Sequence, residues 1–455
     1  MLFSNDFNGG EGKISRRTCF FILAVITLVV RFPFFFPEND LDESTFILLG
    51  HEILKGHLPS VTLWDLKPPL LYGFYAVLQL MGKSIPVVRL AGSFCVLGGA
   101  WFVCIMGEKV RNLRTGLTAG LLLIVYATLT GDGATTSSEI VSLLPVSIAM
   151  FILLGEERGK LDFFLTGLLI SIACMFRLNL AYVALFGCVF LVAAPKLVNS
   201  TLSPGARLAS YACGGALPVI LSILPYWVAG KLGLLYQTCI RAALAYSNSQ
   251  KSPVAILVED LLRFGQWHYL LLHSLMLVSS LGGLTLILAG WKNFEQRSRK
   301  NLATLILFMI ATGISILKSG VAYEQYLIQL LPFCAVIAAF FLDLIMQRRA
   351  APLLVLICAA WLIVPAGRVI AAYRPVIARV RAHRSLCYGP GYRIAAYPRK
   401  NNPDNRPVFM MEEAIVYWLD GGLPSSRISA PSLQYRQRLF AENYRWTRGH
   451  SRSGA

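Results

Sequence analysis

The stretch "DLDESTFILLGHEILKGHLPSVTLWDLKPPLLY", residues 40–72, interrupts a chain that is otherwise strongly apolar. One long apolar segment precedes it, and hydrophobic sequence resumes after it. The stretch opens with a group of carboxylates, closes with an Asp-x-Lys-Pro-Pro sequence and holds two histidines between them. Ionisable groups at membrane depth are costly, and they are by default a hypothesis of a functional site. The alternative is a solvated loop in which "DEST" opens a helix with acidic residues in its first turn.

The composition places the chain among membrane proteins. Of its 455 residues, 56% are hydrophobic and 15% are charged, a balance that soluble domains rarely reach. The apolar residues form repeated runs of roughly 17–25, the length that crosses a bilayer as a helix. Because no water satisfies the backbone inside lipid, each run is expected to be helical. The predicted fold class is therefore an all-α polytopic membrane protein.

The charge distribution sets the predicted topology. The net charge is +18, and much of it lies in short loops, where Lys and Arg hold a loop on the cytoplasmic side. Nucleic acid is therefore not an expected partner. Basic residues precede the first apolar run, which continues through Phe36 without a small-x-small cleavage site. We expect residues 1–17 to be a cytoplasmic segment and the run to be an uncleaved first span.

Length and charge together predict about eleven spans in a transmembrane domain of residues 18–372. The spans are expected at about 18–36, 86–107, 115–130, 140–154, 162–176, 180–195, 208–229, 270–290, 301–317, 327–346 and 351–371. The run Pro69–Met81 is too short to cross and carries two tyrosines, so we expect it to be a helix lying at the outer surface. It belongs to an outer first loop of residues 37–85.

The tail, residues 373–455, differs in composition from the spans. From position 374 on it holds 14 Lys and Arg against 5 Asp and Glu, which is half of the net charge of the chain. We expect a small, partly ordered domain on the outer face. Within it, "EEAIVYWL" indicates a short strand or helix, followed by a turn at "DGGLP". A basic outer domain favours an anionic partner.

The predicted layout brings polar residues from several segments to the outer face. Lys67 follows Asp65 on a turn stiffened by two prolines, and Arg177 lies in a tight turn between two spans. Cations held at an interface bind phosphate, although Lys67 can equally anchor ordinary headgroups or pair with Asp65. The candidate site residues on this face are Asp42, Glu43, Asp65, Lys67, Asp132, Glu139, Arg177, Glu324 and Tyr326.

Taken together, these segments resemble the polyprenyl-phosphate-sugar-dependent glycosyltransferases of the GT-C fold. The nearest resemblance is to bacterial relatives of protein O-mannosyltransferases and of aminoarabinose (lipid A) transferases. The matching motifs are Asp42-Glu43, "KGHLP" at 55–59, "WDLKPPLLY" at 64–72 and Glu139 at a span start. "EQYLIQLLP" resembles a late motif of the family, with Gln325 where His is usual. "EAIVYWLDGGLPSSRISAP" resembles a segment that follows the last span, so the resemblance covers most of the chain.

The resemblance implies a donor sugar on a polyprenyl phosphate and a hydroxyl acceptor from the outer side. Asp42, with Glu43 beside it, would form the catalytic pair, and Asp42 would be the general base of a single displacement. Lys67 and Arg177 would bind the donor phosphate. The residues that would orient the base or the sugar are Asp65, Asp132, Glu139, Glu324 and Tyr326. A divalent cation among these acids, Mg or Mn, is left open by the sequence.

The resemblance also implies a location and partners. The protein would be a multi-pass protein of a bacterial inner membrane, in contact with membrane lipids, with its site on the periplasmic face. The acceptor would be an envelope glycolipid or glycan, such as lipopolysaccharide or lipid A. The alternatives are a protein O-glycosyltransferase of the same fold and a transporter or flippase for a lipid-linked sugar. A transporter would place its polar groups at mid-membrane, typically on broken helices.

Overall fold

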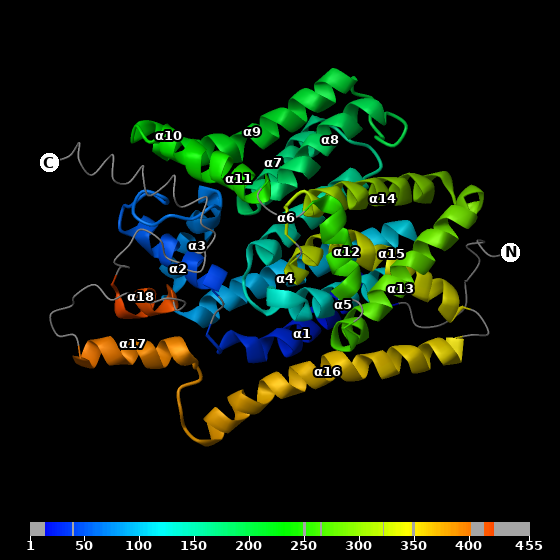
Figure 1. Cartoon of the computed structure of the whole chain (residues 1–455). Coiled ribbons are helices and arrows are strands. Elements are labelled where there is room, and N and C mark those ends of the chain that lie inside the picture. Colours follow the sequence, from blue (N-terminus) through cyan, green and yellow to red (C-terminus); the bar gives the residue numbers. More distant parts are fainter. Residues whose placement is uncertain are drawn as a thin grey trace.

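A computed structural model describes residues 14–38, 41–248, 252–263, 266–321, 323–347, 351–401 and 414–422. Within these ranges the chain is helical, with one isolated bridge between Pro37 and Tyr388 and no strand. Figure 1 shows the long helices lying side by side. The all-α fold class expected from the composition is confirmed. Residues 1–13, and residues 402–413 and 423–455 of the predicted tail domain, lie outside the described ranges.

Each predicted span corresponds to a helix of the structure. These helices are α1 (Arg16–Arg31), α4 (Ile85–Val110), α5 (Leu113–Leu129), α6 (Ser138–Leu153), α7 (Lys160–Phe176), α8 (Ala181–Ala193), α9 (Pro204–Val228), α13 (Trp267–Ala289), α14 (Gln296–Leu317), α15 (Leu331–Met346) and α16 (Ala351–Arg381). Among the described residues, seven helices are long and apolar enough to cross a membrane. The helices from α5 to α8 are shorter, at 13 to 17 residues. The chain is therefore a multi-pass membrane protein, and the number of eleven spans stays a prediction.

Polar contacts join helix ends at two opposite ends of the bundle. At one of them, the basal end, Arg16 at the start of α1 pairs with Glu108 near the end of α4 (2.9 Å). At the same end, Arg111 just beyond α4 pairs with Asp343 near the end of α15 (2.5 Å). The opposite end, the loop end, holds residues 32–84 and the starts of α4 and α6. The start of α1 and the ends of α4 and α15 therefore lie at the basal end, whereas the starts of α4 and α6 lie at the loop end.

The first loop forms a small helical layer at the loop end. Its elements are the 3-10 helix η1 (Phe32–Phe35), α2 (Leu41–Leu54) and α3 (Pro69–Met81). The bounds of α3 agree with the short helix predicted for this run, and proline is well tolerated at the first position of a helix. One face of α3 buries Leu71, Tyr72 and Tyr75 in a cluster shared with α2. The loop is thus a packed layer and not an open connection.

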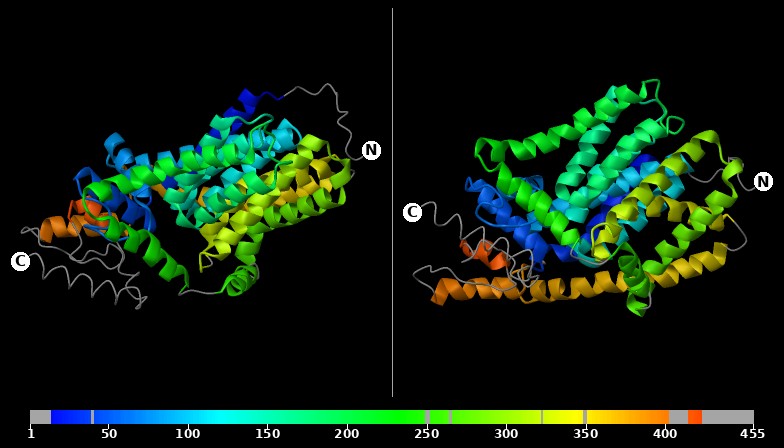
Figure 2. Two further views of the ribbon diagram at one scale, coloured as in Figure 1. Left: turned by 90° about the horizontal axis from the view of Figure 1, so that it is seen from above. Right: turned by 45° about the horizontal axis from the view of Figure 1, so that its top comes forward.

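The described part of the tail returns to the loop end. After α16 come α17 (Pro390–Asn401) and α18 (Ala414–Asp420), so the run "AIVYWL" is a helix. Trp418 of α18 donates its Nε1–H to Oε1 of Gln79 in α3 (2.8 Å), and Gln79 donates to the carbonyl of Ile47 in α2 (2.8 Å). Figures 1 and 2 show α2, α3, α17 and α18 gathered at one end of the molecule. The extent of a separate tail domain stays a prediction.

The connection between α9 and α13 also lies against the first loop. It consists of α10 (Leu232–Leu235), the π-helix η4 (Tyr236–Ala242), α11 (Ala243–Asn248) and α12 (Pro253–Arg263). The Tyr226 hydroxyl at the end of α9 donates to the carbonyl of Pro59 (2.8 Å), and the Cys239 thiol donates to the carbonyl of Lys67 (3.6 Å). The connection between the predicted spans at 208–229 and 270–290 is therefore largely helical in its described part.

Small residues bring α7 and α9 into close contact. A Cβ on Gly167 would lie only 2.0 Å from the carbonyl oxygen of Tyr211. Four residues further along α7, the Ser171 hydroxyl donates to the carbonyl of Gly215, four residues further along α9 (2.7 Å). The two helices therefore run in the same direction from the basal end. Close backbone approach at small residues is a common way of packing helices in membranes.

We expect Gly214→Ala to destabilise this contact, because the new Cβ would lie 1.9 Å from the carbonyl oxygen of Phe164. Overpacking of this kind costs about 1–3 kcal/mol, so the melting temperature of the detergent-solubilised protein should fall by a few degrees. Gly313→Ala in α14 is the matched control, since no atom lies within 4 Å of its Cβ position and alanine favours a helix. Equal melting of the two variants would contradict the close approach of α7 and α9.

Candidate functional site

The Asp-x-Lys-Pro-Pro sequence folds around the carboxylate of Asp65. One carboxylate oxygen accepts the backbone N–H of Leu66 (2.7 Å), and the other accepts the hydroxyl of Tyr72 (2.8 Å). The Tyr72 oxygen in turn accepts the backbone N–H of Lys67 (3.2 Å). The two prolines that follow have no N–H that needs a partner. The spacing of Asp, Lys and Tyr therefore has a structural reason: three hydrogen bonds fix the turn that presents Lys67.

Asp65 and Lys67 lie in different environments although they are neighbours. Burial raises the pKa of the Asp65 carboxyl, while the nearby Lys67 charge lowers it and the Asp42 charge raises it further. Lys67 is half-buried. Among the described residues its ammonium group makes no hydrogen bond or ion pair, so the predicted alternative of a self-paired Asp65–Lys67 bridge is not observed. The ammonium group is therefore available to another anion.

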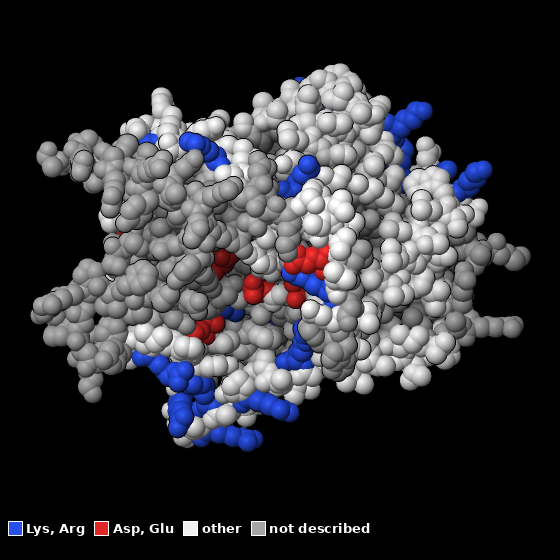
Figure 3. All heavy atoms as spheres, in the orientation of Figure 1, with Lys and Arg blue, Asp and Glu red and all other residues white. Residues whose placement is uncertain are grey.

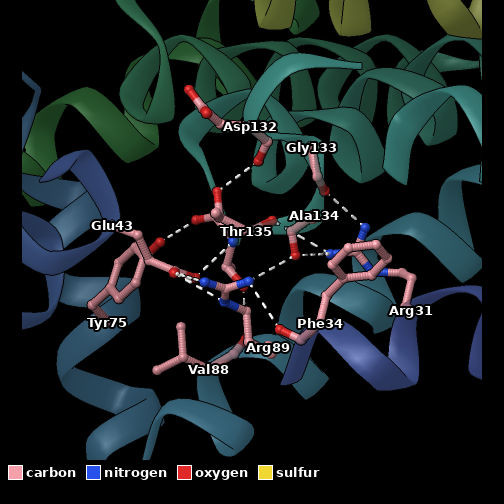
Figure 4. Close-up of polar contacts among 11 residues, drawn as sticks. Arg31, Phe34, Glu43, Tyr75, Val88, Arg89, Asp132, Gly133, Ala134 and Thr135 are labelled. Atoms are coloured by element: carbon pink, nitrogen blue, oxygen red, sulfur yellow. Dashed lines mark hydrogen bonds and ion pairs between the residues drawn. The ribbon is translucent and has the colours of Figure 1, made fainter. Parts of the chain in front are cut away.

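Glu43 lies in a buried polar network that Figure 4 shows. Its side chain has no exposed surface. Arg89 of α4 approaches one carboxylate oxygen with Nη2 (2.7 Å) and Nε (2.9 Å), and the backbone N–H of Thr136 donates to the other oxygen (2.7 Å). Both oxygens are thus occupied, and Glu43 is suited to hold α2 against α4 and the loop before α6.

Two arginines from the ends of predicted spans complete this network (Figure 4). Arg31, at the end of α1, donates to the carbonyl of Gly133 (2.9 Å) and to the Ser93 hydroxyl (2.9 Å). Arg89 donates to the carbonyl of Ala134 (3.0 Å). These carbonyls help to offset the burial of two guanidinium groups against one carboxylate. Neither arginine was predicted as a site residue, although a charge inside a predicted span is itself a signal.

Asp42 precedes Glu43 in the first turn of α2 but has a different environment. Successive positions on an α-helix point about 100° apart. Glu43 faces the interior, whereas Asp42 is exposed and, among the described residues, makes no hydrogen bond or ion pair. The Asp42 charge acts on Asp65, Asp132 and Arg177, so it lies near all three. An accessible carboxylate in this position is able to take a proton from a bound hydroxyl group.

Arg177, in the turn after α7, is held by the start of α6. Its Nη1 lies 2.6 Å from Oε1 of Glu139 and donates to the Ser138 hydroxyl (3.1 Å). The guanidinium group lies over the ring of Tyr326, 3.9 Å from its centroid, in the 3-10 helix η6 (Glu324–Leu330). Three predicted residues therefore meet here. Because Glu139 already neutralises Arg177, a donor phosphate would have to share this arginine with Glu139.

Asp132 and Glu324 lie on adjoining turns. Asp132 belongs to the 3-10 helix η2 (Gly131–Ala134), which packs on η6 so closely that a Cβ on Gly131 would lie 2.8 Å from the backbone nitrogen of Gln325. Glu324 lies 3.0 Å from Nε2 of His273 in α13, a partner that was not predicted. Burial, strengthened by the neighbouring carboxylates, raises the pKa of Asp132 to about 6. Asp132 is thus an acid that titrates close to neutral pH.

The nine predicted residues all lie on segments of the loop end. Figure 3 shows Asp and Glu side chains gathered at the centre of one face of the molecule. Within the part of the chain that the structure describes, no group of three or more His, Cys, Asp or Glu residues is arranged to hold a metal ion. The chemical roles assigned to the nine residues stay predictions.

Comparison with known proteins identifies the fold. No family model matches the chain, and no curated protein matches its sequence. The chain is similar to the structure of ArnT from Cupriavidus metallidurans bound to undecaprenyl phosphate, with a TM-score of 0.53 and 15% identity over 71% of this chain and 60% of that chain. It is also similar to the apo oligosaccharyltransferase of Archaeoglobus fulgidus, with a TM-score of 0.51 and 13% identity over 91% and 61%.

These similarities confirm the GT-C fold that the sequence motifs led us to expect. At 13% and 15% identity they concern the fold alone. The matched region spans 60% and 61% of the two neighbours.

We expect Arg89→Gln to destabilise the protein strongly, because it leaves the Glu43 carboxylate buried without its cation. Removing one partner of a buried pair typically costs about 3–5 kcal/mol. Thermal unfolding in detergent measures the loss, and Glu43→Gln combined with Arg89→Gln should recover part of it, which a double-mutant cycle quantifies. Arg16→Gln, at the exposed pair of the basal end, is the control and should change little. A loss no greater than that of Arg16→Gln would show that the network is unimportant.

Asp132→Asn tests the raised pKa of this carboxyl. Between about pH 4 and pH 6 the native state keeps a proton that the unfolded state loses, so the contribution of Asp132 to stability falls as pH rises through that window. The asparagine variant should therefore gain more stability relative to the parent at about pH 7.5 than at about pH 4.5. The exposed Glu157→Gln at the basal end serves as the control. A difference from the parent that is the same at both pH values would rule out the raised pKa.

Proposed function

We propose that the protein is a membrane glycosyltransferase, which transfers a sugar from a polyprenyl-phosphate donor to a hydroxyl acceptor at the lipid–water boundary. The observation that carries this proposal is the contrast within the site. Glu43, Glu139 and Asp65 have occupied carboxylates, whereas Asp42 is exposed and its charge acts on Asp65 and Asp132. The GT-C fold, which glycosyltransferases use, supports the same class of reaction.

The proposed reaction is a single displacement. The Asp42 carboxylate takes the proton of the acceptor hydroxyl, and the acceptor oxygen attacks the anomeric carbon of the donor sugar. The bond between that carbon and the phosphate oxygen breaks, and its electrons leave with the polyprenyl phosphate. Lys67 neutralises the phosphate as the charge develops. The configuration at the anomeric carbon is inverted, and no general acid is needed because phosphate is a good leaving group.

The other predicted residues have supporting roles in this proposal. Glu43 fixes α2 and so positions Asp42, while Arg177 shares its charge between Glu139 and the donor phosphate. Asp132 and Glu324, with Tyr326 below Arg177, would contact the sugar hydroxyls. Lys67 is the stronger of the two predicted phosphate ligands because, unlike Arg177, it has no acidic partner among the described residues.

Partners and location follow from the same proposal. The donor's lipid chain would lie in the membrane, a view supported by the undecaprenyl phosphate in the structure of the similar ArnT. We propose an anionic envelope glycolipid or glycan, such as lipopolysaccharide or lipid A, as the acceptor, because the tail is strongly basic. The site would face the periplasm of a bacterial inner membrane. A flippase is less well supported, since the charged network lies at one end of the bundle and not at its middle.

Turnover of donor tests the proposal. The purified protein in vesicles is incubated with a panel of polyprenyl-phosphate sugars and an envelope extract, and the release of free polyprenyl phosphate is measured. One of the donors should release polyprenyl phosphate, and Asp42→Asn should slow this release by about 10²–10⁴-fold. Glu157→Gln, exposed at the basal end, should match the parent. Folded parent protein that releases no polyprenyl phosphate from any donor would overturn the proposal. An Asp42→Asn variant as fast as the parent would overturn the assignment of Asp42 as the base.

A further inference from the structure

A second cluster of buried cations lies at the basal end, away from the candidate site. Arg158 comes two residues before α7, and Arg207 lies in the first turn of α9. Their exposed fractions are only 6% and 4%. Arginine is almost never buried to this extent unless a partner satisfies its charge.

The backbone of Arg158 is bonded to the segment that leads into α9, the helix that carries Arg207. The backbone N–H of Arg158 donates to the carbonyl of Asn199 (3.1 Å), and the Ser200 hydroxyl donates to the carbonyl of Arg158 (2.7 Å). Residues 199–200 lie just before α9. Because α7 and α9 run side by side in the same direction, both helices begin at the same corner of the bundle. Each helix brings the positive end of its dipole, which favours an anion there.

The guanidinium groups are only partly satisfied by protein. Nη2 of Arg158 donates to the carbonyl of Gly155 (3.0 Å), but its Nε and Nη1 are buried and have no acceptor among the described residues. The same is true of Nε and Nη1 of Arg207. A buried charged donor without an acceptor is costly, so such groups point to a bound water or ion.

The neighbouring charges favour an anion over water. The Lys109 ammonium lies near enough to Arg158 for the two charges to repel, and it donates to the carbonyl of Leu154 at the end of α6 (3.4 Å). The nearby carboxylate of Glu156 pairs with Arg297 (2.6 Å), and that of Asp162 accepts the backbone N–H of Gly159 (2.8 Å). Glu156 is thus already paired, and one oxygen of Asp162 is occupied. Burial lowers the pKa of Arg158 to about 10 and the charge of Asp162 raises it, so Arg158 stays charged at neutral pH.

We propose that this corner is a binding site for a phosphate group, formed by Arg158 and Arg207 with Lys109 nearby. Guanidinium groups match phosphate oxygens with paired N–H donors. Basic pockets between helix ends on the cytoplasmic side bind the headgroups of anionic lipids, and the predicted topology puts the basal end on that side. The phosphate comes either from an anionic phospholipid or from solution. The site is separate from the proposed transfer reaction and does not depend on it.

Native mass spectrometry of the full-length protein in detergent tests the proposal, with phosphatidylglycerol, phosphatidylcholine and inorganic phosphate as the three probes. We expect phosphatidylglycerol, or inorganic phosphate, to bind the parent in preference to phosphatidylcholine. Arg158→Gln and Arg207→Gln should each weaken that binding by about tenfold, the size expected for the loss of one charge-assisted hydrogen bond. Arg297→Gln, which is exposed and paired with Glu156, is the matched control and should bind like the parent.

Comparison of the phosphatidylglycerol and inorganic phosphate measurements identifies the source of the phosphate. Binding of phosphatidylglycerol alone assigns the site to a lipid headgroup, and binding of inorganic phosphate assigns it to a soluble anion. If a glutamine variant does not fold, Arg158→Lys and Arg207→Lys keep the charge but lose the paired donors, and they should still bind several-fold more weakly. A parent that binds neither phosphate probe better than phosphatidylcholine, or variants that all bind like Arg297→Gln, would overturn the proposal.

Discussion

The rest of the loop end depends on the buried ion pair between Glu43 and Arg89, with Arg31 beside it. Through it the end of α1, the start of α2, the start of α4 and the loop before α6 share one set of hydrogen bonds. A lost partner in such a place leaves a buried charge unpaired, which costs about 3–5 kcal/mol. The four segments are therefore held in one arrangement.

Because of this constraint, neighbouring residues have different roles. Glu43 is fixed by Arg89 and Thr136, and the fixed helix leaves Asp42 exposed beside it. The first-loop turn repeats the pattern, because the bonded carboxylate of Asp65 fixes the turn from which the Lys67 ammonium projects. A reactive group is best held by a support that is itself locked by packing and hydrogen bonds. Each motif thus contains one residue whose hydrogen bonds fix the backbone and a second residue whose charged group is free to contact a ligand.

The sequence predicted the helices and the end at which the polar residues meet, because run length and loop charge constrain both. The bounds of α3 followed from its length and from the proline at its start. The ion pairs and hydrogen bonds that these polar residues form were not predictable from the sequence. Arg31 and Arg89 lie at the ends of apolar runs, and only the folded bundle brings both to the carbonyls of one loop. For "EEAIVYWL" eight residues were too few to separate strand from helix, and the packing of α18 against α2 and α3 decides the outcome.

The position of α18 has a consequence for biosynthesis. The first loop is made early, but the helix that covers it is made near the end of the chain. Ile415, Val416 and Trp418 are each at most 2% exposed, in the cluster that they share with α2 and α3. The ribosome must therefore complete residue 420, and the insertion machinery must deliver it to the loop end, before this apolar surface is closed. Closure of the loop layer is a late event, and a nascent chain carries an unfinished loop layer while most of its helices are already in place.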